Sequence, residues 1–181
     1  MKRQKMKGFT LVELLIVIAL LGALAIGLIG ALDPFEQLKK GTDTGTRDLV
    51  NQVQTAVLRY YATTSKMPWT DQTAAFSAFD LNNAVLTTAI ANMVTAGEMK
   101  SNFAVIYKNQ LDKVWVTYVP PSPTSSVEVR VCYQPASKSF QVDPATKYLN
   151  DHTGIENETK TGTTACKSSD VAGVNCDWCV Q

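Results

Sequence analysis

The sequence predicts an α+β protein in which a long N-terminal hydrophobic helix packs on an antiparallel β-sheet of three to four strands. Residues 9–32 are almost wholly apolar, and residues 47–61 repeat apolar side chains at three- and four-residue spacing. Residues 103–142 instead alternate apolar and polar side chains, as strands with one buried face do. Residues 143–181 lack apolar periodicity but hold three of the four cysteines, which indicates a disulfide-tethered C-terminal loop.

The first apolar segment is long enough to cross a membrane. From Leu14 to Leu32 there are nineteen consecutive uncharged residues, and residues 9–32 would extend about 36 Å as a helix, against about 30 Å for a hydrocarbon core. A single acid, Glu13, interrupts the segment near its start. Because an ionised side chain in lipid is costly, this carboxylate needs a partner.

The residues around Glu13 resemble a known signal. A basic leader, KRQKMK, ends at Gly8, and FTLVELL follows at residues 9–15. This pattern resembles the class III signal of type IV pilins and pseudopilins. The resemblance implies that a prepilin peptidase removes residues 1–8 by cutting after Gly8 and methylates the new amine of Phe9. It also implies that Glu13 pairs with the N-terminal amine of a neighbouring subunit during assembly.

The same resemblance implies a structural subunit of a type IV pilus-like filament. Such a chain is a single-pass protein of the inner membrane before assembly and part of an extracellular cell-surface filament afterwards. The implied partners are further copies of the chain, membrane lipid, the prepilin peptidase, the inner-membrane assembly platform and minor pilins. Two alternatives stay open: a pseudopilin or minor pilin of a type II secretion or DNA-uptake system, and a membrane-anchored monomeric binding domain.

Two plainer interpretations compete for the same N-terminal residues. A secretory signal would also have a basic start and an apolar stretch, with a cleavage site at residues 23–25, but Glu13 and the apolar residues beyond Ala25 argue against it. A simple anchor with its positive end inside the cell explains the topology but leaves Gly8, Phe9 and Glu13 unexplained.

A break in the stem is expected between Gly27 and Pro34. Gly27 and Gly30 weaken a helix, and Pro34 removes an amide donor and biases the residue before it away from helical geometry. The resemblance implies local loss of helix in this part of the stem within a filament. The hydrophobic helix is therefore assigned to residues 9–34.

Residues 35–64 are expected to form the amphipathic second half of the stem, with residues 41–46 as a turn-like stretch that either interrupts the stem or caps its resumption. Residues 65–101 are a connecting region with a second helix, and this helix ends at Gly97. Its apolar face should comprise Phe76, Phe79, Leu86, Ile90 and Met93.

Residues 102–142 are expected to form the antiparallel sheet. The predicted strands are residues 103–108, 113–119, 127–133 and 139–142. In the third of these, Val129 and Val131 should face the core and Cys132 the accessible side. Residues 143–181 form the C-terminal loop.

The disulfide candidates are Cys132, Cys166, Cys176 and Cys179. An even number of cysteines in an exported domain favours disulfides. Type IV pilins commonly tether their C-terminal loop to the sheet, which implies that Cys132 bonds to one of the three later cysteines while the other two pair. Three connectivities remain open. Trp178 is expected to pack on a disulfide.

Some residues of the C-terminal region also suggest other chemistry. The C-x-x-C at Cys176 and Cys179 also suggests redox activity or half a zinc site, and His152, the single histidine, is expected at the surface. A calcium loop was considered for the C-terminal acids, which lack EF-hand spacing: Asp143, Asp151, Glu156, Glu158 and Asp170. No metal, cofactor or catalytic residue is predicted, and without a catalytic motif the sequence gives no case for an enzyme.

Charge argues against a nucleic-acid partner. The formal net charge is +1, and residues 1–8 contribute four positive side chains, so the chain without them carries 1 minus 4, or −3. A basic face is therefore not indicated.

Overall fold

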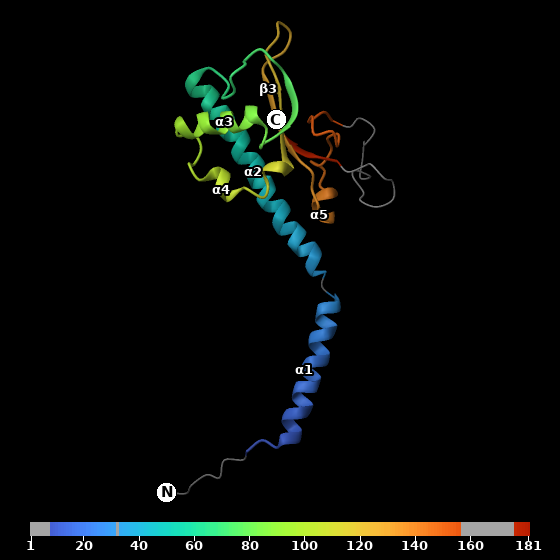
Figure 1. Ribbon diagram of the computed structural model, residues 1–181. Coiled ribbons are helices and arrows are strands. Elements are labelled where there is room, and N and C mark those ends of the chain that lie inside the picture. The colour runs from blue at the N-terminus through green and yellow to red at the C-terminus, as the bar shows by residue number, and fades with distance from the viewer. Residues whose placement is uncertain (1–7, 32, 157–175) are drawn as a thin grey trace. The chain divides into compact units, whose positions relative to one another are not determined.

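The computed structural model describes residues 8–31, 33–156 and 176–181, and the chain divides into two compact units, residues 1–38 and 39–181. The first unit contains helix α1 and the start of α2, and the second contains the rest of α2 with the sheet (Figure 1). The helices are α1 (Leu11–Ala31), α2 (Pro34–Thr64), α3 (Ala84–Thr95), α4 (Phe103–Ile106), the 3₁₀ turn η1 (Leu111–Lys113) and α5 (Lys138–Gln141). The strands are β1 (Phe76–Asp80), β2 (Val114–Val119), β3 (Glu128–Tyr133) and β4 (Trp178–Val180).

Helix α1 ends at Ala31 and α2 begins at Pro34, with Asp33 outside both helices. Asp33 caps α2, because its Oδ1 accepts a hydrogen bond of 3.2 Å from the amide of Glu36. Pro34 suits the first helical position, where its missing N–H would have had no partner. The predicted interruption therefore lies at Pro34, whereas Gly27 and Gly30 lie within α1 and the helix continues through them.

Helix α2 supplies one side of the core. Leu49, Val50, Val53, Ala56 and Val57 are buried together with side chains of β2 and β3, so this helix packs on the sheet as predicted.

The turn expected at residues 41–46 is wrong, since these residues lie inside α2. Two threonines in the stretch donate to carbonyls one turn earlier, Thr44 to Lys40 at 2.8 Å and Thr46 to Thr42 at 3.0 Å. Their hydroxyls are thus satisfied by carbonyls of the helix itself, and the helix continues through the stretch.

The sheet has four antiparallel strands in the order β1-β2-β3-β4. On its core face, Val116 lies opposite Val131 and Tyr118 opposite Val129. Successive side chains of a strand point to opposite faces, so the other face carries the row Trp115, Cys132 and Cys179. The number of strands and the α+β class agree with the prediction.

Two of the four predicted strands are wrong. Residues 103–108 contain helix α4 and residues 139–142 largely form α5, while the outer strands of the sheet are β1 and β4. β1 occupies the edge of β2, and β4 occupies the edge of β3. The short apolar runs in α4 and α5 therefore take no part in the sheet.

The second helix expected within residues 65–101 is only partly correct. α3 begins after the cap Asn83, whose side chain accepts from the amide of Val85 at 2.9 Å, and ends before Gly97, which has φ +78°. Phe76 and Phe79 are in β1 instead, where they lie opposite Tyr118 and Val116. A bulge in β1 sets the three-residue step from Phe76 to Phe79 against a two-residue step on β2. Two apolar side chains three positions apart, a spacing typical of a helix, therefore occur in one strand.

Candidate functional site

Gly8, Phe9 and Thr10 precede α1 without helical structure. The side chain of Phe9 is 84% exposed, and a Cβ added at Gly8 would meet no atom within 4 Å. The predicted cleavage point thus lies in an open, non-helical stretch of chain. Residues 1–7 of the leader lie outside the described residues.

Thr10 and Glu13 form a capping box at the start of α1. The Oε2 atom of Glu13 accepts hydrogen bonds from the amide and the hydroxyl of Thr10, both at 2.9 Å, and the amide of Glu13 donates to Thr10 Oγ1 at 3.3 Å. The sequence prediction assigned Glu13 only to a neighbouring subunit and missed this local partner. The signal was present, because a threonine followed three residues later by an acid is a capping-box pattern.

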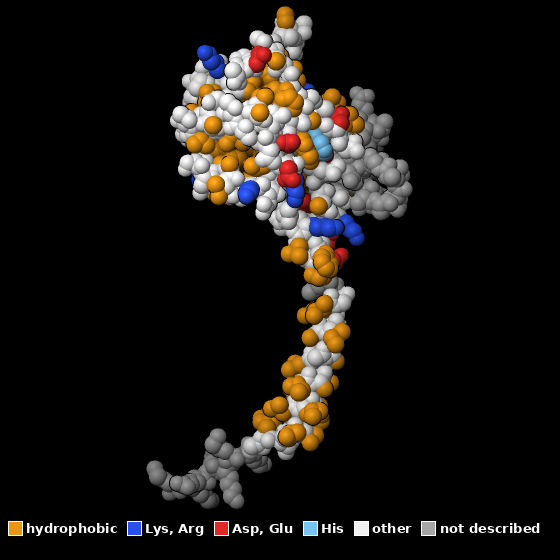
Figure 2. All heavy atoms as spheres, in the orientation of Figure 1, with side chains coloured by type: hydrophobic (Ala, Val, Ile, Leu, Met, Phe, Trp, Pro, Cys, Tyr) orange, Lys and Arg blue, Asp and Glu red, His pale blue; other side chains and the backbone are white. Residues whose placement is uncertain are grey.

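Helix α1 is apolar on every side. Leu11–Gly30 is the one helix among the described residues that is long and apolar enough to cross a membrane, and all of its residues are exposed. Figure 2 shows apolar side chains along its whole visible length. Since burying a leucine or isoleucine is worth about 1.5–3 kcal/mol, this surface needs lipid or other helices around it.

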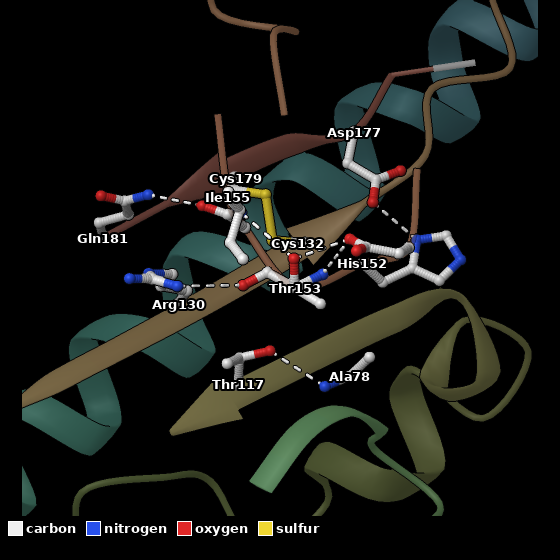
Figure 3. Close-up of a disulfide and its surroundings, with 12 residues drawn as sticks. Ala78, Thr117, Arg130, Cys132, His152, Thr153, Ile155, Asp177, Cys179 and Gln181 are labelled. Atoms are coloured by element: carbon white, nitrogen blue, oxygen red, sulfur yellow. Dashed lines mark hydrogen bonds and ion pairs between the residues drawn. A yellow bond between two sulfur atoms is a disulfide. The ribbon is translucent and has the colours of Figure 1, made fainter. Parts of the chain in front are cut away.

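The second notable region is the C-terminal end of the sheet. Cys132 of β3 and Cys179 of β4 lie directly opposite each other and form a disulfide, with their Cα atoms 4.1 Å apart (Figure 3). Cys176 is also disulfide-bonded, and Cys166 lies outside the described residues. The prediction that Cys132 bonds to a later cysteine is therefore correct, but its side chain is fully buried and not accessible.

These disulfides rule out two of the alternatives for the C-x-x-C. Cys179 is bonded to Cys132 and not to Cys176, so the pair is not a dithiol that cycles between two adjacent cysteines. Zinc binds thiolates, and each cysteine in the described part of the chain is oxidised.

His152 is not an isolated surface residue. Its Nδ1 lies 2.7 Å from Oδ2 of Asp177, and its ring stacks on Trp115 with centroids 3.5 Å apart. Asp177 is fully buried, and burial raises the pKa of its carboxyl, partly offset by the hydrogen bond from His152. A pairing between residues 25 positions apart has no local sequence signal.

Trp178 lies on the core face of β4, the opposite face from the Cys132–Cys179 disulfide. It sits opposite Tyr133 in the sheet, and the guanidinium of Arg47 lies 4.4 Å from its ring centroid. Arg47 also forms an ion pair of 3.1 Å with Asp143, so α2 holds the start of the C-terminal region.

The remaining acids considered for calcium have other partners where they are described. Asp151 accepts from Thr153, and Glu156 pairs with Lys147. Glu158 and Asp170 lie outside the described residues.

Taken together, a basic leader, an open Gly8-Phe9 junction and a capped apolar helix with Glu13 in its first turn define a type IV pilin-like class III signal peptide. Residues 3–29 match the family model described as the prokaryotic N-terminal methylation motif. No curated protein and no solved structure matches the chain.

The match supports a protein of the type IV pilin kind in general. Such a motif implies processing by a prepilin peptidase and assembly into filaments, and it points to a structural protein and not to an enzyme. The single N-terminal apolar helix fits membrane anchoring before assembly.

Proposed function

We propose that this protein is a structural subunit, a pilin, of a type IV pilus-like extracellular filament. The observation that carries the proposal is the methylation motif joined to a helix that is exposed and apolar on all sides. In the membrane, lipid covers this helix. In the filament, the α1 helices of other copies replace the lipid, so assembly exchanges one apolar environment for another.

Glu13 fixes the register of each subunit against the next one during assembly. Before assembly its carboxylate is held by Thr10 in the capping box. After cleavage at Gly8, the methylated amine of Phe9 in a neighbouring subunit offers a full positive charge. Two opposite unit charges in contact attract more strongly than a charge and neutral hydrogen-bond donors, so the intersubunit pair outweighs the cap.

The stem can lengthen where its helices are interrupted. α1 and α2 are already separate at Asp33, and Gly27 and Gly30 lie within the last two turns of α1. We infer that in the filament the unwound region grows from Pro34 toward these glycines, because each costs about 1 kcal/mol more than alanine in a helix.

Mass spectrometry of the mature N-terminus tests the proposal. An N-methylated Phe9 is expected on chains recovered from sheared surface filaments. An intact Met1, or a start after Ala25, would contradict it and favour the anchored or secreted binding domain. A processed chain that is scarce in the sheared fraction would instead assign it to a minor pilin or pseudopilin.

A further inference from the structure

A short strap of chain, residues 148–156, lies over the Cys132–Cys179 disulfide (Figure 3). Gly154 lies close to the disulfide, since a Cβ at this position would lie 3.2 Å from Cys132 Sγ and 2.8 Å from Arg130 Cδ. Its φ of +73° also belongs to the left-handed region that favours glycine. The disulfide is consequently shielded, with Cys132 fully buried and Cys179 only 7% exposed.

Backbone and side-chain hydrogen bonds hold the two ends of the strap. Tyr148 exchanges backbone hydrogen bonds of 3.2 and 3.1 Å with Asp177, and Leu149 donates to the carbonyl of Ile155 at 2.8 Å. Gln181 at the end of the sheet donates to the carbonyl of Gly154 at 3.0 Å. The strap is thus a closed loop attached to the strand that carries Cys179.

One side chain fastens the middle of the strap. His152 stacks on Trp115 of β2 and binds Oδ2 of Asp177, whereas Oδ1 of that carboxylate has no hydrogen-bond partner among the described residues. Trp115 is next to Cys132 in the cross-strand row, so this contact stands directly beside the disulfide. A buried carboxylate that loses its donor keeps its desolvation penalty, which favours the closed position of His152.

We propose that the strap is a protective cover for the Cys132–Cys179 disulfide and that His152 is the latch that keeps it closed. The cover controls access of external thiols to the sulfur atoms. A thiolate must reach one sulfur, form a mixed disulfide and release the other cysteine as a thiolate. Packing of Gly154 against Cys132 prevents this approach until the strap opens.

Reduction kinetics of the full chain in detergent test this inference. Dithiothreitol supplies two electrons: one of its sulfurs attacks the disulfide, and the second closes the reagent into a ring while both cysteines are released. Alkylation followed by peptide mass spectrometry then measures how fast Cys132 and Cys179 become labelled.

The key variants are His152→Ala and His152→Phe, of which the second keeps a ring to stack on Trp115 but has no side-chain nitrogen to bind Oδ2 of Asp177. Both should accelerate labelling of Cys132 and Cys179, His152→Ala by about tenfold or more, because the lost hydrogen bond involves a charged group. Ile155→Ala is the matched control, since this strap side chain is 51% exposed and should leave the rate unchanged.

Val53→Ala distinguishes opening of the strap from a general loss of stability. It is a core change in α2, far from the strap in sequence. The free energy of unfolding is measured for each variant. The inference is overturned if Val53→Ala accelerates reduction as much as an equally destabilised His152 variant, or if both His152 variants leave the rate unchanged. It does not depend on the proposed filament role.

Discussion

Tyr133 is a buried residue whose hydroxyl has no hydrogen-bond partner among the described residues. Burial raises the pKa of this phenol well above its ordinary value, and the nearby carboxylate of Asp43 adds to the effect. The folded protein therefore favours neutral tyrosine, whereas the unfolded chain ionises it above about pH 10. Stability from this residue is kept below that pH and lost as the pH rises beyond it.

Tyr133→Phe should leave the free energy of unfolding unchanged or raise it by up to about 1 kcal/mol at neutral pH, since it removes an unsatisfied buried hydroxyl. It should also reduce the loss of stability above pH 10. Chemical denaturation at pH 7 and pH 10.5 measures both effects. A loss of more than about 1 kcal/mol at pH 7 would mean that the hydroxyl has a stabilising partner, as buried polar groups usually do.

At the scale of elements, Asp43 joins α2 to the chain after β3. Its carboxylate is buried and accepts hydrogen bonds from the amides of Ala136, at 3.0 Å, and Ser137, at 2.7 Å. These amides directly precede α5, which explains why the chain turns away from the sheet there. The prediction of a strand at residues 139–142 did not include this contact, because Asp43 lies 93 positions before Ala136 in the sequence.

Asp43→Ala should lower the free energy of unfolding by about 1–3 kcal/mol, because it leaves buried amide donors without an acceptor. Asp43→Asn keeps a side-chain oxygen of similar shape and should recover part of the loss. Thermal or denaturant unfolding of the full chain measures the difference. Equal stability of all three proteins would show that water replaces the carboxylate.

At the scale of the whole molecule, a folded C-terminal unit is joined to a helix that is apolar on every side. Such a helix requires a surrounding of lipid or protein, and Glu13 is the charged residue within its span. The proposed filament satisfies both requirements through other copies of the same chain.

Glu13→Ala should leave the protein in the membrane while the yield of sheared filaments falls sharply, since the Phe9 amine loses its partner charge. Glu36→Ala is a suitable control, because Glu36 occupies the corresponding position three residues after the cap of α2. Quantitative immunoblotting of membrane and sheared fractions measures the outcome. An equal loss for both variants would indicate that Glu13 acts as a helix-capping residue and not as an assembly residue.

The local features of the chain were determined by the sequence alone. The class III signal, the apolar span, the interruption at Pro34 and the amphipathic second half of the stem depend on neighbouring residues, so spacing and residue type are sufficient to predict them. The bonding of Cys132 to a later cysteine followed from the resemblance to exported pilins.

The tertiary structure decided which segments became strands and which distant residues met. Whether an apolar run becomes a strand depends on its packing against neighbouring strands, and β1 and β4 pair with β2 and β3 whereas the similar runs at residues 103–108 and 139–142 do not. The choice of Cys179, the pairing of His152 with Asp177 and the burial of Cys132 likewise depend on contacts between segments far apart in sequence. Local residue patterns do not predict these contacts, because the contacts arise from how distant segments pack together.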